Sequence, residues 1–351
     1  MNSKLASLSL LAFCVVAALA LWFSATAVVP SLIAEFGLKP SQVSMLTGAV
    51  QVGFVVGTLA SAVLGLADRT DPRAFFMASA LVATIANTGI LFVDPTSWEI
   101  IVFRFITGAC MAGVYPVGMK MMASWANTGA RKKNGKNADM GFLIGVLTGA
   151  VTLGSGAPHL FNALGGVDWR ITIALGSVFS LASALLINLF RMGPRHPKTP
   201  PFDFHMAFKG FTVPSLRYAN FGYLGHMWEL YAMWVWLGVF LDASFRISMA
   251  ADDAAFWARS ATFVVIGVAG GIGCVTAGLL ADRFGRTTIT IAALAVSGTC
   301  ALVTGLFFGG NPYVLFAICF VWGFAIVADS GQFSASIVEL SPPDRIGTVL
   351  T

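Results

Sequence analysis

Two short acidic-basic turns, far apart in the chain, are copies of one another. The later copy is Gly278–Arg286 (GLLADRFGR) and the earlier one is Gly65–Arg73 (GLADRTDPR), with their aspartates 214 residues apart. A second pair of segments, FRFITG at 103–108 and ICFVWG at 318–323, aligns at an offset of 215. Two separate pairs at nearly the same offset indicate a chain built from two copies of one unit.

Long apolar runs flank both copies of the turn. An apolar run of ~18 residues or more is long enough to cross a bilayer as a helix. Because 57% of the residues are hydrophobic and 11% are charged, with a mean hydropathy of +0.81, lipid rather than water must surround most of the surface. We therefore expect an all-α membrane protein. The sequence predicts ten spans, at residues 5–29, 42–66, 74–93, 98–125, 138–161, 167–190, 216–241, 256–280, 287–308 and 313–338.

The two turns also carry a family pattern, G-x-L-A-D-R-x-G-R between spans two and three with an echo between spans eight and nine. In this pattern the chain resembles the major facilitator transporters, which are bundles of twelve spans in two pseudo-repeated halves. The later copy matches nearly in full, whereas the earlier one has Leu64 at the first glycine position and Asp71-Pro72-Arg73 where Gly-Arg is expected. The glycine-rich fifth span also resembles the family, but Ala150 replaces the proline of the drug antiporters, which disfavours drug efflux.

The chain divides at residues 191–215, which are rich in proline, lysine and arginine. We interpret this segment as a linker between an N-terminal six-helix bundle, 1–190, and a C-terminal bundle of four spans, 216–351. At an offset of 215, the counterparts of spans five and six would lie beyond Thr351. We therefore expect a fragment of a twelve-span protein, truncated after the tenth span, poorly stable and transport-deficient.

The basic residues are distributed unevenly between the two sides of the predicted membrane. With the N-terminus in the cytoplasm, the inner loops hold fifteen lysines and arginines and the outer loops hold four. This positive-inside bias predicts that both turns and the linker face the cytoplasm, as in a multi-pass protein of a bacterial inner membrane. The net charge of +5 therefore requires no nucleic-acid partner.

No pattern of catalytic chemistry is present in the sequence. The five cysteines lie within apolar runs and none form a C-x-x-C pair, which is typical of small packing residues rather than of disulfides or metal ligands. No hydrolase elbow, phosphate-binding loop or metal cluster accompanies them. We expect a protein that is not an enzyme and that needs no cofactor and no metal.

Ionisable side chains within the spans are the strongest candidates for function, because each costs at least ~2.5–3.5 kcal/mol at a bilayer centre unless it is paired or wetted. His226 and Glu229 share one face of span seven, and such a pair could trade a proton near neutral pH or only lock helix packing. Arg104 in span four could bind an anionic substrate, steer proton release or form a structural ion pair. Asp329 in span ten is a cavity candidate. The resemblance implies that spans one, four, seven and ten line a central cavity, where these four residues fall.

Other side chains have weaker claims. Lys120 can extend to the membrane interface, so we interpret it as structural. Five aromatic residues could stack on an organic substrate or simply fill the core: Trp22, Tyr115, Trp228, Trp234 and Trp236. The resemblance further implies a cytoplasmic gate in which loop aspartates near helix N-termini and arginines from the opposite half hold the outward-open state. Its members here are Asp68, Arg69, Arg73, Asp282, Arg283 and Arg286.

The sequence thus predicts a secondary active transporter that moves a small solute by alternating access, coupled to protons. Two alternatives remain open at this point. One is a facilitated-diffusion uniporter, and the other is a membrane sensor that uses the same fold only to bind. The expected partners are a small-molecule substrate, protons and the lipid bilayer, and we expect a monomer.

Overall fold

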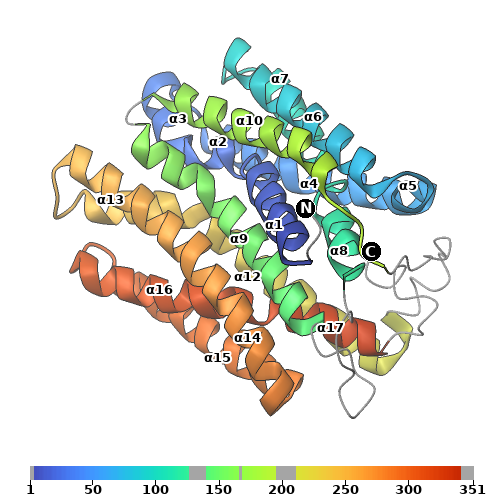
Figure 1. Cartoon of the computed structure of the whole chain (residues 1–351). Helices are drawn as coiled ribbons and strands as arrows, with labels where there is room; N and C mark the ends of the chain where they lie inside the picture. Colours follow the sequence, from blue (N-terminus) through green and yellow to red (C-terminus); the bar gives the residue numbers. More distant parts are fainter. Residues whose placement is uncertain (1–3, 126–139, 166–167, 195–210, 341–351) are drawn as a thin grey trace.

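The computed structural model describes residues 4–125, 140–165, 168–194 and 211–340. Within these ranges every regular element is helical, and the helices run side by side along one long direction (Figure 1). The predicted linker, 191–215, falls largely outside the described residues. So do the basic connector before span five and the last residues of the chain.

The first half of the bundle contains the spans that precede the linker. Its helices are α1 (Lys4–Leu19), α2 (Ser24–Ala27), α3 (Val29–Phe36), α4 (Pro40–Leu64), α5 (Leu66–Arg69), α6 (Pro72–Gly89), α7 (Glu99–Met111), α8 (Tyr115–Ala123), α9 (Met140–Leu164) and α10 (Trp169–Leu186). Short 3₁₀ turns, Ile90–Phe92 and Ile187–Leu189, extend α6 and α10.

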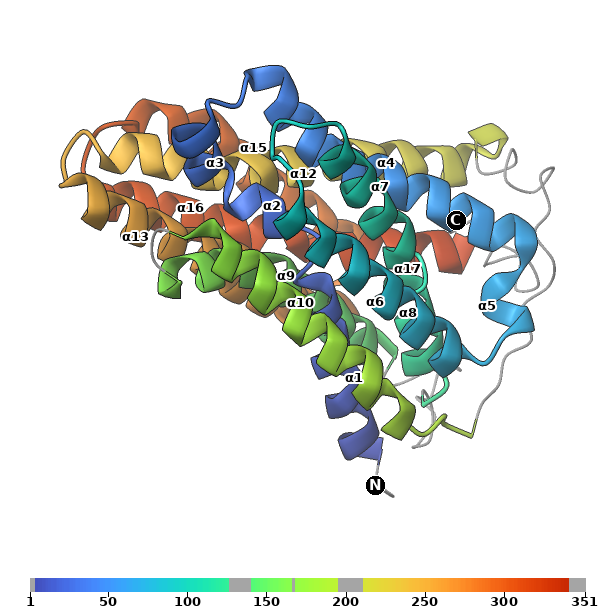
Figure 2. The same cartoon turned by 90° about the horizontal axis from the view of Figure 1, so that it is seen from above.

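The second half follows the linker. It comprises α12 (Pro214–Phe245), α13 (Ala251–Phe263), a π-helical turn (Val264–Ala269), α14 (Gly270–Phe284), α15 (Arg286–Thr304), a 3₁₀ turn (Gly305–Phe307), α16 (Pro312–Ala328) and α17 (Ser330–Leu340). The α4 helix packs along α7 in the first half, and α14 packs along α16 in the second. The halves meet where α9 lies against α13, the π-helical turn and α14 (Figures 1 and 2).

Eight helical segments in the described residues are long and apolar enough to cross a membrane. The two remaining predicted spans correspond to α12, which is 32 residues long but contains several charged side chains, and to the region of α1. The predicted first span, 5–29, is not one uninterrupted helix, because α1 ends at Leu19 and the shorter α2 and α3 follow. A buried side chain binds carbonyls at this break, as described below.

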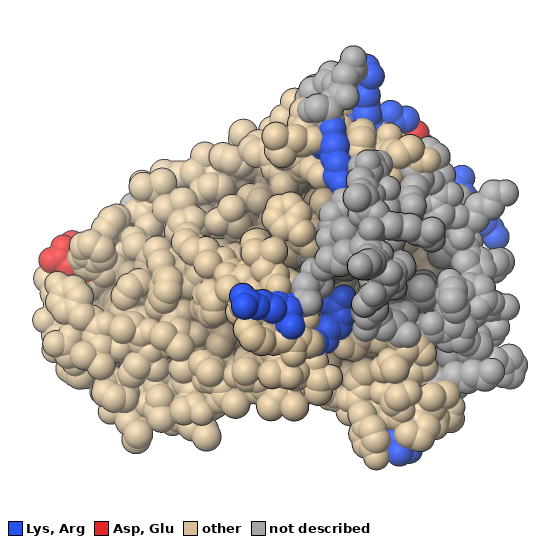
Figure 3. Space-filling model, turned by 60° about the horizontal axis from the view of Figure 1, so that its bottom comes forward, with Lys and Arg blue, Asp and Glu red and all other residues tan. Residues whose placement is uncertain are grey.

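The surface is that of a protein solvated by lipid. Many large apolar side chains on the outer helix faces are exposed, among them Ile85, Leu302 and Leu306. In the face shown in Figure 3, lysine and arginine side chains lie from the centre to the right, with a small acidic group among them at the upper right. Another acidic group lies at the left end, beyond a broad uncharged surface. This distribution fits a helical bundle whose middle lies in hydrocarbon.

The two acidic-basic turns end their helices differently. In the earlier copy the left-handed glycine is Gly65 (φ 63°), which stops α4 before the short α5. In the later copy α14 continues through the Asp-Arg pair, and Gly285 (φ 90°) stops it. Gly65 and Gly285 adopt positive φ at little cost and end their helices, whereas Gly278, inside α14, does not. The departure of the earlier copy from the family pattern is therefore a difference in helix termination.

Candidate functional site

A break in the tenth predicted span places an acid in the interior of the bundle. The α16 helix ends at Ala328 and α17 begins at Ser330, so Asp329 lies at the junction. Nδ1 of His226, on α12, is 2.9 Å from Oδ1 of Asp329, and both side chains are 1% exposed. The other ring nitrogen of His226, Nε2, is 2.5 Å from Oγ of Ser330. These three residues form a buried acid-imidazole-hydroxyl group.

The contact between His226 and Asp329 is close but is not an aligned hydrogen bond. Neither carboxylate oxygen of Asp329 has a hydrogen-bond partner among the described residues, and neither has Nδ1 of His226. A buried carboxylate without hydrogen bonds is expensive in an apolar interior unless a cation or a bound proton neutralises it. The carboxylate can therefore be neutralised by an imidazolium at His226 or by a proton of its own, and these two neutral arrangements hold the same number of protons.

The predicted pairing of His226 with Glu229 is wrong. The Glu229 carboxylate instead accepts from Trp322 Nε1 (3.0 Å) and from Ser297 Oγ (3.3 Å), which lie on α16 and α15. Residues three apart on a helix point in directions that differ by about 60°. On α12 this difference is enough to direct His226 toward α17 and Glu229 toward the neighbouring helices.

Aromatic rings surround this group and continue across the junction of the halves. Tyr223 and Phe333 stack at 5.6 Å, and each lies within about 6 Å of the His226 ring. Between the halves, Trp22 stacks on Tyr231 at 6.2 Å, and Phe23 meets Trp234 edge-on at 5.7 Å.

Two of the predicted aromatic candidates lie away from the junction. Trp228 is 82% exposed and Trp236 is also exposed, so both fit a lipid-facing position better than a solute site. The indole nitrogens of Trp22 and Trp234 are buried and lack a hydrogen-bond partner within the part of the chain that the structure describes. Trp22 and Trp234, unlike Trp228 and Trp236, can therefore offer N–H donors to a solute within the bundle.

Arg104 is fully buried and binds the break in the first predicted span. Its guanidinium donates to the carbonyl oxygens of Leu21 (2.9 Å) and Trp22 and to Oγ of Ser24 (3.3 Å). These carbonyls follow the end of α1, and that of Leu21 also accepts from Oγ of Ser24 at 3.0 Å and from the backbone N–H of Ser24. The predicted alternative of a structural ion pair for Arg104 is thus not what the contacts show, since its acceptors here are carbonyl and hydroxyl oxygens.

Ser24 connects Arg104 to a second polar side chain that the sequence did not single out. Its hydroxyl is 2.7 Å from Oδ1 of Asn87, and Nδ2 of Asn87 donates to Ser177 Oγ and to the carbonyl of Ile173. A lone asparagine in an apolar span is the only signal that could have drawn attention to it. The network holds α2, α6, α7 and α10 together.

Two of the predicted gate residues, Arg73 and Arg283, make contacts within their own halves. Arg73 pairs with Asp71 at 2.7 Å, and the guanidinium holds the pKa of the Asp71 carboxyl below its usual range. Arg283 lies over the ring of Phe284, and Arg69 is exposed near the end of α5. The backbones of Asp68 and Asp282 belong to α5 and α14, but their side chains lie outside what the structure describes.

Arg286 is the gate candidate closest to the junction of the halves. Its Nη1 donates to Oε1 of Gln332 at 3.0 Å, and it lines a cleft that also contains Gly145 and Thr148 of α9. The cleft holds about 10 Å³, roughly the volume that one water needs. Lys120, in contrast, donates to the carbonyl of Ala67 at 2.7 Å, within its own half.

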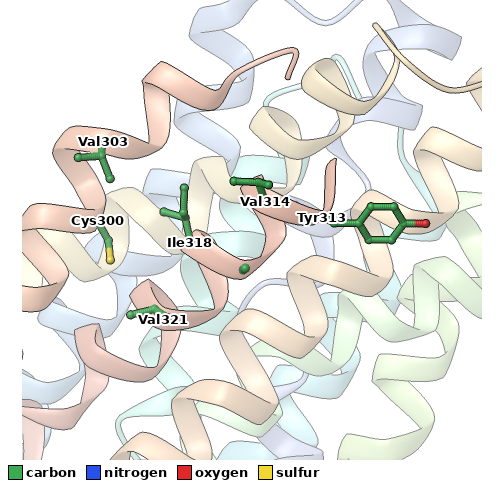
Figure 4. A pocket seen from close by; sticks show the side chains of 7 residues that line it. Cys300, Val303, Tyr313, Val314, Ile318 and Val321 are labelled. Carbon is green, nitrogen blue, oxygen red and sulfur yellow. The ribbon is translucent and has the colours of Figure 1, made fainter. Parts of the chain in front are cut away.

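A larger groove of about 510 Å³ lies on the outer side of α15 and α16 (Figure 4). Its wall is apolar and offers a solute almost no polar group, unlike the interior that contains Asp329 and His226. We interpret it as part of the lipid-facing surface. It is lined by Cys300, Val303, Tyr313, Val314, Ala317, Ile318 and Val321.

The comparisons with known proteins identify the family. Residues 11–351 match the family model of the Major Facilitator Superfamily. The chain belongs to the Major Facilitator Superfamily. This confirms the predicted family, which is one of membrane transporters rather than enzymes.

The relatives of this major facilitator protein are distant. It is 24% identical over 225 residues to the inner membrane transport protein YnfM of Escherichia coli, covering 61% of this chain and 51% of the relative. It is 21% identical over 161 residues to the niacin transporter NiaP of Acinetobacter baylyi, covering 46% and 34%. The chain therefore spans about half the length of YnfM and less of NiaP. Among solved structures, a D-xylose-proton symporter superposes with a TM-score of 0.68 at 18% identity, covering 99% of this chain and 86% of the symporter.

Proposed function

We propose that this chain is a secondary active transporter that moves a small solute by alternating access and couples that movement to protons. One observation carries the proposal: the acid Asp329 lies at a helix break, 2.9 Å from His226, with both side chains buried. Ionisable groups at a break in a membrane helix are the usual setting for ion coupling in transporters. The fold neighbour named as a proton symporter supports the same conclusion by analogy only.

The proposed coupling step is a change of partner at Asp329. In one state the imidazolium of His226 neutralises the Asp329 carboxylate. When a proton binds the carboxylate, the acid becomes neutral and the attraction to His226 is lost. Ser330, the first residue of α17, also contacts Nε2, so a shift of α17 against α12 breaks this contact as well. The helix break lets α17 make this shift once the attraction to Asp329 is removed, so the proton biases one arrangement of the halves over the other.

The proposed solute is a small organic molecule with a planar part and a hydrogen-bond acceptor. The aromatic contacts Trp22–Tyr231 and Phe23–Trp234 cross the junction of the halves, and the two buried indole N–H groups could bind an acceptor. Niacin, a planar acid carried by the relative NiaP, has both features. D-xylose, which the symporter carries, has only the second.

The remaining predictions complete the proposal. The two bundles, 1–190 and 216–351, would rock about their junction, joined by a cytoplasmic linker at 191–215. The N-terminus would face the cytoplasm of a bacterial inner membrane and the protein would act as a monomer. The gate residues Asp68, Arg69, Arg73, Asp282, Arg283 and Arg286 would hold the cytoplasmic side closed, and Arg286 has the best support because its cleft includes α9.

Uptake into proteoliposomes under an imposed pH gradient tests the proposal. Niacin, D-xylose and a nucleoside would each be offered with and without the gradient. We expect at least one to accumulate only with the gradient, and we expect Asp329→Asn to abolish that accumulation. The matched control is Glu35→Gln, which removes an exposed carboxylate paired with Arg170 at 3.3 Å. Flux that ignores the gradient would favour a uniporter, and saturable binding without any flux would favour a sensor.

A further inference from the structure

One arginine joins the two halves of the bundle through hydrogen bonds. Arg259 lies on α13, in the second half, and its acceptors lie in the first half. Nη1 donates to the carbonyl oxygen of Asn162 on α9 at 3.2 Å, and Nη2 donates to Oγ of Ser31 on α3 at 3.4 Å. A single guanidinium therefore connects three elements from both halves.

These contacts lie at the end of the bundle that is opposite to the acidic-basic turns. Figures 1 and 2 both place α3 and α13 at one end and α5 and α17 at the other. Asn162 extends the connection, because its Nδ2 donates to the carbonyl oxygen of Ala27 at 2.6 Å. The chain of bonds thus ties the end of α2, the end of α9 and the start of α13 to one another.

A buried polar layer lies directly below these bonds. His159 precedes Asn162 by one helical turn and is 3% exposed, and its Nε2 has no hydrogen-bond partner in the described ranges. Oδ1 of Asn162 is likewise without one there. His159 also approaches α12, since a methyl group on Gly238 would lie 3.4 Å from its ring. Polar atoms buried without partners at a junction between halves are expected where water or a solute enters in another conformation.

We propose that Arg259 is the gating residue of this end of the transporter, and that its bonds to Asn162 and Ser31 close the bundle over the His159 layer. The proposal rests on the alternating access proposed above. Arginine suits this position because its planar fork holds two acceptors on different elements at once, which a lysine ammonium does less well. When the halves part at this end, both bonds must break, and Ala27, Asn162 and His159 become accessible.

A neighbouring arginine provides a matched control. Arg246 follows the end of α12, and it binds Asp242 of its own helix through two bonds of 2.7 and 3.1 Å. It has the same charge and lies in the connection to α13, but these bonds do not cross between the halves. Asp242 and Arg246 act electrostatically on Arg259 in opposite senses, so removing Arg246 changes the charge near the gate without removing either of the two bonds. The R246A variant therefore tests whether the loss of a nearby charge is enough to open this end.

Cysteine labelling from the aqueous side tests the gate. The reporter is Ala27→Cys, a buried position below the Arg259 bonds, and the parent without the reporter gives the background from the native cysteines. A membrane-impermeant maleimide is added to right-side-out and to inverted vesicles that contain the full chain. Two hydrogen bonds correspond to roughly tenfold or more in the open-to-closed ratio. We expect the Ala27→Cys chain with R259A to label about tenfold faster than the Ala27→Cys chain alone, from one side only. The Ala27→Cys chain with R246A should label at the rate of the Ala27→Cys chain alone.

Parent-like labelling of R259A, or an equal rise in R246A, overturns the proposal. If R259A fails to fold, R259K carries the test, and a rise of threefold or more supports the gate whereas the parent's rate refutes it. Labelling needs neither a known solute nor a pH gradient. If the proposed transport fails, the labelling result still tests the gate. If labelling is unchanged while transport is intact, only the gate proposal fails.

Discussion

Gly323 occupies the same position in the second half as Gly108 does in the first. A methyl group on Gly108 would overlap the carbonyl oxygen of Val50, and one on Gly323 would overlap that of Val265. Both members of the second pair are 215 residues beyond those of the first, which is the offset that the sequence repeat predicts. The repeat is therefore preserved as a packing contact between the second and fourth spans of each half, where the backbones meet without a side chain between them.

This contact predicts a stability loss on adding one methyl group. Gly108→Ala must push α7 away from α4, and overpacking of this kind costs about 1–3 kcal/mol. The control is Gly48→Ala, on α4, because that position has nothing within 4 Å and a helical alanine is favoured over glycine there. Thermal unfolding in detergent should show a lower melting temperature for the first variant only. Equal melting temperatures would mean that the helices separate freely at this point.

The sequence predicted the positions of the helices better than it predicted which side chains contact one another. Periodicity and composition locate long helices, and the repeat aligns Gly108 with Gly323. They could not show that Arg104 binds carbonyls at the end of α1, because Arg104 is 83 residues from Leu21. Neither could they show that His226 faces Asp329, since a local neighbour, Glu229, offered the same chemistry. Pairings between distant helices are set by tertiary packing, which short-range patterns do not contain.

Arg104 should be more sensitive to substitution than Lys120. Its guanidinium binds the carbonyls of Leu21 and Trp22 at once, and a lysine would leave part of this buried set without donors. Each buried acceptor left unsatisfied costs roughly 1–3 kcal/mol. We expect Arg104→Lys to lower the melting temperature and the amount of folded protein, and Lys120→Arg, whose bond to the Ala67 carbonyl an arginine can also make, to have little effect. Similar, mild effects of the two changes would contradict this role.

The Asp71–Arg73 pair predicts a pH dependence of stability. The pKa of Asp71 is lowered in the folded protein by the hydrogen bond from Arg73, so the unfolded chain binds the proton more readily. The stability that the Asp71–Arg73 pair adds to the folded protein is therefore present above the pKa of Asp71 in the unfolded chain, about 4. It is lost as the pH falls through the pKa of Asp71 in the folded protein. Asp71→Asn keeps an N-cap residue for α6 but removes the charge. The parent should melt higher than this variant at pH 7, and the difference should shrink as the pH falls below about 4; a constant difference would assign the effect to the cap alone.

Two acids within the spans, the half-buried Glu229 and the buried Asp329, compete for the role of proton site, and their contacts make different predictions. Glu229 accepts hydrogen bonds from Trp322 and Ser297, and a glutamine retains acceptor capacity for both. Asp329 has no aligned hydrogen bond to described residues and faces His226 at 2.9 Å. In Asp329→Asn the titrating acid is lost, while the size of the side chain is kept. We therefore expect this variant to lose gradient-driven accumulation and to retain exchange of solute at equal pH. Glu229→Gln should retain most of both activities and a near-normal melting temperature.

Parallel measurement of uptake and exchange in proteoliposomes separates coupling from folding, because a misfolded variant loses both. Loss of accumulation in Glu229→Gln, with Asp329→Asn still coupled, would transfer the proton site to α12 and its contacts with α15 and α16.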